Sequence, residues 1–381
     1  MRRVFVASAI VAAFFAFAIT PPIVAQEIPK SLQGGDSEWA LKQRKNAWTV
    51  GVVGGLLSGT YMRFADELAK ALDDGDNMRI LPIVSYGAAS NLEDLLHLRG
   101  IDAAVTQADV FEYFRTERKT PNLQYRVNYI LRLPISEVHI LARTEYKSLE
   151  DLRGKKVSFG PAGAGSSLTG SIIFQRLGIK VEPLFLNAPA ALQKLRSGEI
   201  AALIRVIGKP IDFFAKLPAD SGLHFLPIPF AKQFEDYYTV GEFTNAEYPT
   251  LVPEGQRVDT LAVPTALAVY NWPKGTDRFN RVERFVEQLF NKWEKFQKPP
   301  FHPKWRDVNL AATVPGWTRF SVAERMLQSV MANTKQQKVL SRDFHAFLSN
   351  DARPSPRSEA EREALFRDFL AWRKQQDGRS Q

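Results

Sequence analysis

Residues 48–133 alternate between short apolar runs, typical of buried strands, and segments whose apolar positions recur with the period of a helix. The strand-like runs cover 48–53, 78–84, 102–106 and 125–133, and the helical segments cover 61–72, 90–98 and 108–116. A strand followed by a helix and another strand is the repeating unit of a parallel sheet with helices on its faces. This part of the chain is therefore predicted to form an α/β lobe.

Residues 137–228 repeat the same alternation. The segment 137–142 predicts a short strand that carries the chain across to a second lobe. Strands at 156–159, 181–185 and 201–206 and helices at 167–177 and 189–195 then build that lobe. Residues 231–257 are rich in aromatic residues, proline and glycine, and their pattern predicts neither a helix nor a strand.

The remaining sequence returns to the first lobe. Residues 259–270 form a long apolar run that suits a return crossing, and a helix is predicted from residue 277 to about 298 because its apolar positions share one face. The segment Arg353-Pro-Ser-Pro-Arg357 predicts a linker, followed by a charged terminal helix at 358–375. We interpret that helix as packing on the body, with contact to a partner as the alternative.

These elements predict an α/β protein of two lobes, each a mainly parallel sheet flanked by helices, joined by crossing hinge strands. Lobe 1 takes residues 47–135 and 258–352, lobe 2 takes 136–257, and 353–381 holds the linker and C-terminal helix. The hinge strands are expected near 133–137 and 251–259, where they would absorb a closing motion of the lobes.

The first 25 residues differ from the rest. Arg2 and Arg3 precede an apolar run at 4–19, which is shorter than the ~20 residues of a membrane-spanning helix. This pattern predicts a signal peptide at 1–25, cleaved after Ala25, with an uncleaved anchor as the alternative. Residues 26–46 are expected to be a flexible lead-in, and the mature protein is expected in the periplasm, without stable membrane insertion.

The formal charge of +9 becomes +7 without Arg2 and Arg3 (9 − 2 = 7). A mild basic excess suits an anionic small ligand or an anionic membrane surface. Nucleic acid is not expected as a partner, because the chain is predicted to be exported and no dense basic run with aromatic residues occurs. The chain has no cysteine, which excludes disulfides, thiolate catalysis, thiolate metal sites and a lipidated cysteine.

A strand, a glycine loop and a helix occur twice, with Gly59 and Gly165 in matching places 106 residues apart (165 − 59 = 106). A glycine loop that opens a helix presents backbone N–H groups to an anion, and hydroxyl side chains flank both loops. Two such loops in matched lobes predict a cleft that closes on an anion. For either loop alone, a tight turn capped by a serine is the alternative.

The candidate ligand contacts are polar residues at these loops and at the carboxyl ends of neighbouring strands, where parallel sheets place ligands. Gln107 and Asp109 follow one strand, with turn and capping roles as the alternative. Arg205 interrupts the apolar run 201–207 and offers a guanidinium for a carboxylate, with an exposed edge position as the alternative. The predicted ligand-binding set is Ser58, Gly59, Thr60, Tyr61, Ser90, Gln107, Gly165, Ser166, Ser167 and Arg205.

Catalytic motifs are not matched. Ser166 stands where a nucleotide-binding P-loop needs lysine, and Leu168 stands where a dinucleotide fingerprint needs its third glycine. The glycine that a hydrolase elbow needs after its serine is also missing. The five histidines have no metal-ligand spacing. We therefore expect no cofactor, no metal and no enzyme activity, with hydrolysis of an acid ester at Ser166 as the weakest alternative.

A series of short segments occurs in a characteristic order. In chain order the segments are 52–61, Gly87-Ala-Ala-Ser-Asn-Leu92, 101–109, 137–143, 148–161, Gly163-Ala-Gly-Ser166 and Gly198-Glu-Ile-Ala-Ala202. The first of them contains Gly54-Gly55 and Ser58-Gly-Thr-Tyr61. This order, over residues 48–320, resembles the TAXI solute receptors of tripartite ATP-independent periplasmic (TRAP) transporters. The resemblance implies a type II-like periplasmic binding protein that delivers an acidic solute, glutamate or a related dicarboxylate, to TRAP membrane permease subunits. It also implies ligand contacts at Ser58, Thr60, Tyr61, Ser90, Gln107, Gly165, Ser166 and Ser167.

The chain departs from the TAXI pattern in three places. Leu56-Leu57 stands where the family prefers small residues, Val314-Pro-Gly-Trp317 replaces a His-Pro-Gly segment, and the terminal helix beyond 353 is additional. Two other functions are compatible with the same sequence. One is the binding protein of an ABC importer for aromatic sulfonates or pyrimidine precursors, and the other is a periplasmic sensory or scaffold component.

Overall fold

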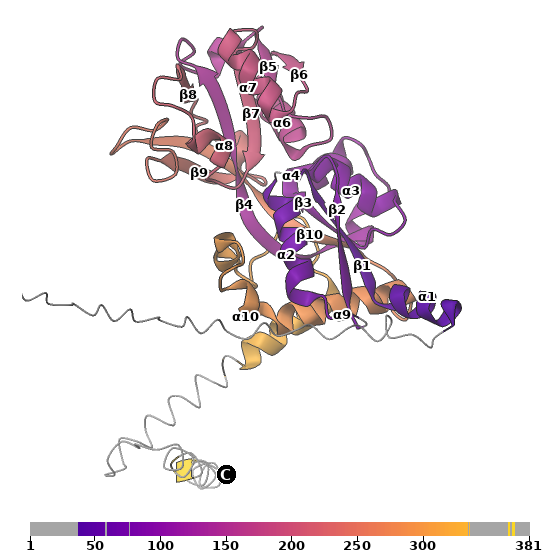
Figure 1. Ribbon diagram of the computed structural model, residues 1–381. Coiled ribbons are helices and arrows are strands. Elements are labelled where there is room, and N and C mark those ends of the chain that lie inside the picture. Colours follow the sequence, from indigo (N-terminus) through magenta and orange to yellow (C-terminus); the bar gives the residue numbers. More distant parts are fainter. Residues whose placement is uncertain are drawn as a thin grey trace, which may run out of the picture.

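The structure, a computed structural model, describes residues 37–57, 59–75 and 77–333, together with residues 335, 365, 368 and 369. Within these residues the strands form one ten-stranded sheet in the order β2-β1-β3-β10-β4-β7-β5-β6, with β8 beside β4 and β9 beside β10. Helices cover the sheet, and the described chain divides into a lower and an upper lobe (Figure 1). The predicted two-lobed α/β fold is confirmed.

Lobe 1, the lower lobe of Figure 1, begins with three parallel strands and the helices that connect them. These are β1 (Thr49–Gly55), α2 (Thr60–Leu72), β2 (Arg79–Val84), α3 (Ala88–His97), β3 (Ala103–Gln107), α4 (Ala108–Thr116) and the short α5 (Leu123–Arg126). Strand β1 is buried on both faces, because Val52 packs towards α2 and Val53 packs towards α3. Each predicted helix overlaps its observed range, and α4 matches its prediction residue for residue.

Lobe 2, the upper lobe, repeats the arrangement with shorter strands. It contains η2 (Glu150–Leu152), β5 (Lys156–Ser158), α6 (Gly165–Leu177), β6 (Glu182–Leu184), α7 (Ala188–Ser197), β7 (Ala202–Ile207), α8 (Asp212–Ala215), β8 (Leu223–Phe225), η3 (Lys232–Phe234) and β9 (Thr239–Thr244). Strand β9 lies in the region for which the sequence pattern predicts no element. It forms by antiparallel pairing with β10, a partner that a local pattern does not reveal.

Two long antiparallel strands, β4 (Val127–Arg143) and β10 (Arg257–Tyr270), run through both lobes (Figure 1). Leu131 and Leu267 lie in a core cluster of lobe 1, whereas Ile140 and Leu261 lie in a core cluster of lobe 2. These strands therefore carry the chain between the lobes.

The sequence predicts separate strands at 125–133 and 137–142, and this is wrong because β4 is continuous. The proline between them, Pro134, lies at an irregularity where the register shifts between Val263 and Thr265, opposite Pro264. A proline at a bulge costs no ladder hydrogen bond, so it does not end the strand. The run 259–270, predicted as the return crossing, lies within β10 and contains this irregularity. The segment 251–259, where a hinge strand is expected, begins inside lobe 2, since Leu251 packs in the core of that lobe.

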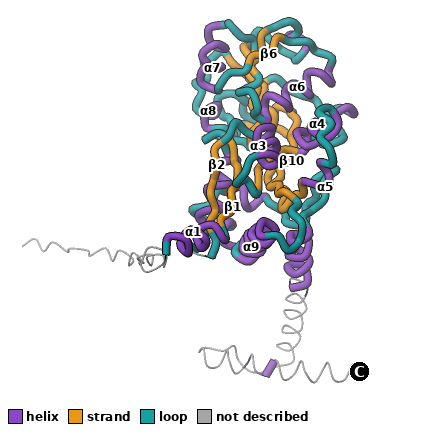
Figure 2. The backbone as a smooth tube through the Cα atoms, turned by 90° about the vertical axis from the view of Figure 1, so that its right-hand side faces the viewer, coloured by secondary structure: helices purple, strands orange, loops and turns teal. Residues whose placement is uncertain are grey.

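Helix α9 (Asp277–Asn291) lies at the base of lobe 1, as Figure 2 also shows. Thr276 accepts a hydrogen bond from Phe279 N at 3.2 Å and so caps its start. The predicted helix to residue 298 is divided, because a second short helix, α10 (Trp293–Phe296), follows α9. The chain then passes through η4 (Pro303–Asp307).

The N-terminal helix α1 (Glu38–Ala47) lies within the range predicted as a flexible lead-in, so that prediction differs from the structure there. The Ser37 hydroxyl accepts from Ala40 N at 3.2 Å and caps this helix. The predicted signal peptide, the rest of the lead-in and the predicted linker lie outside the described residues, as does the terminal helix apart from residues 365, 368 and 369.

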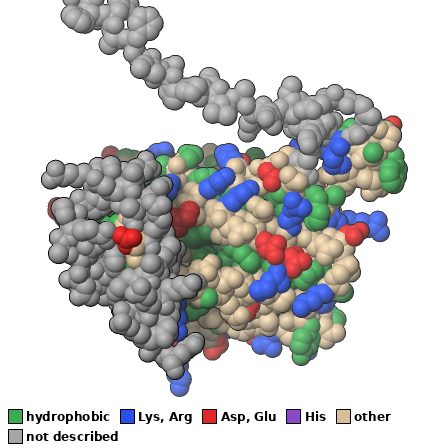
Figure 3. All heavy atoms as spheres, turned by 90° about the horizontal axis from the view of Figure 1, so that it is seen from below, with side chains coloured by type: hydrophobic (Ala, Val, Ile, Leu, Met, Phe, Trp, Pro, Cys, Tyr) green, Lys and Arg blue, Asp and Glu red, His purple; other side chains and the backbone are tan. Residues whose placement is uncertain are grey.

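The surface of lobe 1 seen from below carries basic and acidic side chains side by side (Figure 3). The basic excess of the chain is therefore not gathered into one patch on the part of that face that the structure describes. None of the helices among the described residues combines the length and the apolar character that crossing a membrane requires.

Candidate functional site

Three helices begin where the two lobes meet, and their N-cap residues are Gly59 for α2, Gly87 for α3 and Ala164 for α6. None of these three residues makes a side-chain cap hydrogen bond. By contrast, α1, α7 and α9 are capped by serine, asparagine and threonine side chains. The first N–H groups of a helix need a partner, so three uncapped ends together form a donor-rich region.

These helix ends surround a cavity of about 50 Å³, here called the inter-lobe cavity. Lobe 1 lines it from the end of β1 and the starts of α2 and α3, and lobe 2 lines it from the start of α6 and the end of β7. The lining residues are Gly54, Gly55, Leu56, Gly59, Thr60, Tyr61, Tyr86, Gly87, Ala88, Ala164, Gly165, Ser166, Arg205, Val206 and Ile207.

Glycines let the lobes approach closely around the cavity. Gly87 has φ +126°, and a β-carbon there would lie 3.1 Å from Ala164 Cα in the other lobe. A β-carbon on Gly165 would lie 1.8 Å from Gln107 Oε1, which is too close for any larger residue without displacement. Ser90 N also donates to Gly163 O across the interface at 3.0 Å. The described lobes are thus in direct backbone contact.

Arg205 of β7 lines the inter-lobe cavity and is half-buried. Burial lowers the pKa of the Arg205 guanidinium below its ordinary value, and no carboxylate contributes to the shift. No ion pair or side-chain hydrogen bond joins Arg205 to any described residue. A desolvated charge without a partner is costly, so its presence at a cavity indicates a site for an anion.

Gln107, at the end of β3, is fully buried, and neither polar atom of its side-chain amide has a partner among the described residues. The amide lies against Gly165 in the cavity wall. Buried polar groups are nearly always hydrogen-bonded, so Gln107 is a second group at this junction that a ligand or water would satisfy.

Tyr61 lines the cavity with its side chain, but its hydroxyl is engaged elsewhere. The hydroxyl lies 2.8 Å from Ser136 Oγ and 3.2 Å from Thr265 Oγ1, so it joins the two crossing strands. Burial raises the pKa of the Tyr61 hydroxyl to about 12. Tyr61 therefore ties α2 to the hinge, which its position in the sequence does not reveal.

Of the residues predicted for the ligand site, the cavity is lined by Gly59, Thr60, Tyr61, Gly165, Ser166 and Arg205. Ser90 and Ser167 face a neighbouring groove instead, and Ser167 Oγ donates to Ala164 O at 2.7 Å. Ser58 lies outside the described residues. The predicted set omits Gly87 and Ala88, although a glycine directly before a helix is the same signal that singled out Gly59.

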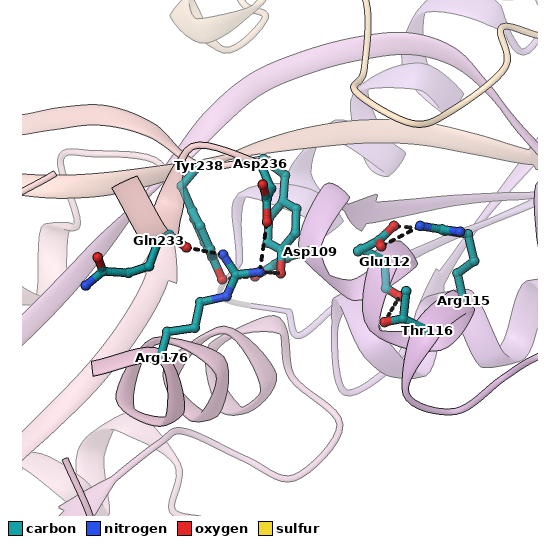
Figure 4. Close-up of polar contacts among 9 residues, drawn as sticks. Asp109, Glu112, Arg115, Thr116, Arg176, Gln233, Asp236 and Tyr238 are labelled. Carbon is teal, nitrogen blue, oxygen red and sulfur yellow. Dashed lines mark hydrogen bonds and ion pairs between the residues drawn. The ribbon is translucent and has the colours of Figure 1, made fainter. Parts of the chain in front are cut away.

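A buried carboxyl group on α4, that of Asp109, bridges the lobes, and Figure 4 draws it together with Tyr238 of lobe 2. Asp109 accepts hydrogen bonds from Thr169 Oγ1 of α6 at 2.6 Å and from Tyr238 O–H at 3.0 Å, both in lobe 2. Val110 N also donates to it, at 2.8 Å. Burial raises the pKa of the Asp109 carboxyl to about 6, although these hydrogen bonds lower it in part. Asp109 thus holds the closed arrangement and does not face the cavity.

A larger groove of about 520 Å³, here called the outer groove, lies between α4 and α6. It contains Arg176, which donates to Tyr237 O–H at 2.5 Å and lies 3.5 Å from an Asp236 carboxylate oxygen. Glu112 and Glu117 also line it. Because its arginine already has partners and its walls carry carboxylates, the outer groove is a poor anion site despite its volume.

The described residues contain no group of three or more histidine, cysteine, aspartate or glutamate side chains arranged for a metal ion. His139 is buried, and its ring nitrogens contact Tyr248 Oη at 2.7 Å and Glu137 O at 3.0 Å. Burial lowers the pKa of His139 to about 3, so the ring is neutral and serves packing rather than proton transfer.

Several solved structures are similar to this chain. One is described as a periplasmic transporter, with 12% identity, coverage of 74% of this chain and 93% of that chain, and a TM-score of 0.45. A mutant arginine-binding protein from T. maritima has 15% identity, coverage of 70% and 98%, and a TM-score of 0.43. A putative periplasmic sulfonate-binding protein from Methylobacillus flagellatus has 12% identity, coverage of 66% and 69%, and a TM-score of 0.35.

The sequence itself was compared with models of protein families. A model of the NMT1-like family matches residues 53–275, which is more than half of the chain. The matched region contains both glycine loops, Arg205 and the two crossing strands. The protein is therefore a member of the NMT1-like family.

Proposed function

We propose that this protein is an extracytoplasmic solute-binding receptor that captures a small organic anion between its two lobes. The observation that carries the proposal is Arg205, a half-buried arginine that lines the inter-lobe cavity without a carboxylate partner. Three uncapped helix N-termini point their partial positive charge towards the same space. An anionic solute would satisfy both features at once.

Capture involves motion of the lobes. A cavity of about 50 Å³ is far smaller than the ~300–1,000 Å³ of typical ligand pockets, so the lobes must separate to admit a solute. The paired irregularity at Pro134 and Pro264 is the place where β4 and β10 can bend. The glycine contacts and the Asp109 hydrogen bonds then hold the lobes together after closure.

The partner and the compartment rest on the sequence. The signal-like segment at 1–25 supports export to the periplasm, and the TAXI resemblance supports delivery to TRAP permease subunits. An ABC importer for sulfonates or pyrimidine precursors is the alternative partner. The membrane subunits encoded beside this gene distinguish the two, because TRAP and ABC importers differ in the presence of an ATPase subunit.

The proposed function is tested by calorimetric titration of the purified protein with glutarate, succinate, benzoate and ethanesulfonate, each compared with its uncharged amide. We expect saturable binding of at least one acid and no binding of its amide, because the amide cannot neutralise Arg205. Binding of the amides with an affinity equal to that of the acids would show that the cavity is not an anion site.

A further inference from the structure

Many of the backbone carbonyl groups around the inter-lobe cavity already accept a hydrogen bond from the protein. The carbonyl groups of Gly54, Gly55, Leu56, Gly87, Ala88 and Ala164 each accept a hydrogen bond of 2.7–3.2 Å from elsewhere in the protein. Ser166 Oγ accepts from Val206 N at 2.9 Å, so its own proton is left to donate. The hydroxyl groups of Thr60 and Tyr86, which also line the cavity, can donate as well as accept, so the wall holds no carboxylate and few oxygen atoms that only accept.

The donor groups around the same cavity remain available. The backbone N–H groups of Ala88 on α3, and of Gly165 and Ser166 on α6, have no hydrogen-bond partner among the described residues. The Arg205 guanidinium adds further donors and a full positive charge. The Gln107 amide, fully buried against Gly165, is also unpartnered; it does not line the cavity, and it offers an acceptor oxygen as well as two donor hydrogens.

No aspartate or glutamate lines the inter-lobe cavity. The buried carboxyl groups at the lobe interface have partners of their own: Asp109 accepts from Thr169 and Tyr238, and Glu137 accepts from Lys209 N at 2.8 Å. An ammonium group carries three donors and no acceptor. In this cavity it would find no counter-charge, and it would share the space with Arg205.

We propose that the cavity selects solutes whose polar head only accepts hydrogen bonds, such as a carboxylate or sulfonate with no ammonium group beside it. The site would then reject glutamate and other α-amino acids and bind their deaminated analogues. This inference deepens the proposed anion-binding function and rests on it. Selection works by repulsion, because the excluded solute adds an unpaired like charge to a desolvated site.

The test is a calorimetric comparison of matched pairs on the purified protein, glutarate against glutamate and ethanesulfonate against 2-aminoethanesulfonate. We expect the deaminated member of each binding pair to bind at least ~100-fold more tightly. If the amino member binds equally or more tightly, the inference is wrong while the proposed function stands. If no acid binds at millimolar concentration, the proposed function fails and the inference fails with it.

A pair of neighbouring variants locates the selectivity. Leu56→Asp adds a carboxylate to the cavity wall, and we expect it to reduce the ratio of glutarate to glutamate affinity at least ~10-fold by supplying a counter-charge for the ammonium. Leu57→Asp is the control, because Leu57 is 77% exposed and does not line the cavity. An equal change in the ratio of glutarate to glutamate affinity in both variants would mean that the overall charge of the protein, not the cavity wall, sets the preference for glutarate. Circular dichroism of each variant shows that it is folded.

Discussion

Two arginines of lobe 2 lie at the lobe interface in opposite circumstances. Arg205 is half-buried at a small cavity and has no carboxylate partner, whereas Arg176 lies in the outer groove with Tyr237, Gln233 and Asp236 around it (Figure 4). The outer groove has ten times the volume, about 520 Å³ against about 50 Å³. The comparison teaches that the state of the charged groups, rather than the size of the space, supports the inter-lobe cavity as the proposed anion site.

The difference follows from the cost of burying charge. Arg176 meets its hydrogen-bonding needs within the protein, so it stabilises the folded chain and has little left for a ligand. Arg205 is desolvated without compensation, which the fold tolerates at a cost to stability. Such a cost is expected where a ligand supplies the missing partner.

The largest expected effect comes from removing the unpaired charge. Arg205→Met should weaken binding of an acid by about 1,000-fold, roughly 4 kcal/mol, because the ligand carboxylate loses its half-buried partner. The same variant should raise the free energy of unfolding, since it removes an uncompensated half-buried cation. Titration calorimetry and urea denaturation measure the two effects. Arg176→Met is the matched control. A comparable loss of acid binding in this variant would contradict the proposal that Arg205, and not Arg176, binds the ligand.

The second effect concerns Asp109, which accepts hydrogen bonds from Thr169 and Tyr238 of lobe 2. Its pKa of about 6 lies above its ordinary value of 3.8, so the folded protein holds this proton more tightly than the unfolded chain. The contribution of Asp109 to the free energy of unfolding is therefore complete below pH ~4. As the pH rises through about 6 this contribution is lost, and the free energy of unfolding falls by roughly 3 kcal/mol.

Asp109→Asn should remove this part of the pH dependence, as seen in the free energy of unfolding measured between pH 4 and 7. Glu112→Gln is the control, because Glu112 lies on the same helix and pairs with Arg115 at the surface. An unchanged pH profile in Asp109→Asn would show that the carboxyl is not held in the closed interface as described.

A smaller effect is expected from blocking lobe approach. Gly87→Ala places a methyl group 3.1 Å from Ala164 Cα and should weaken ligand binding about 10-fold, because closure displaces backbone. Gly100→Ala is the control: Gly100 also has a positive φ, +91°, but its added β-carbon meets nothing within 4 Å. Both variants carry backbone strain, so equal affinities in the two would contradict a role for Gly87 in closure.

The smallest effect is expected in the outer groove. Asp236→Asn removes an ion pair with Arg176, but the Asp236 side chain is 73% exposed. Exposed ion pairs contribute little, so the free energy of unfolding should change by less than about 1 kcal/mol and ligand affinity should stay the same. A clear loss of affinity, measured by the same titration, would indicate that the outer groove takes part in binding.

Most of the fold could be predicted from local pattern. The alternation of strands and helices gave the two lobes, and helix α4 was predicted to the residue, because burial on one face imposes a regular period. Features that depend on distant parts of the chain escaped this reasoning. Strand β9 depends on pairing with β10, and β4 continues through Pro134 because that residue lies at a bulge opposite Pro264.

The candidate site was predicted in part for a similar reason. Gly165, Ser166 and Arg205 were identified from a glycine loop and from a charge inside an apolar run, and the structure brings them to one cavity. Ser90 and Ser167 belong to the predicted set because they lie in the first turn of a helix. Both line the neighbouring groove instead, because the direction of a side chain in the first helical turn depends on tertiary packing. Ligand binding by any of these residues stays a prediction.

The sequence by itself determined that this is a two-lobed α/β chain with a glycine loop before a helix in each lobe, because periodicity and glycine act locally. Only the tertiary structure decided which polar groups have partners. Tyr61 finds Thr265 across 204 positions and Asp109 finds Tyr238 across 129, whereas Arg205 finds no carboxylate. Hydrogen bonds and charge pairs depend on distances in space, and it is these distances that separate the inter-lobe cavity from the outer groove.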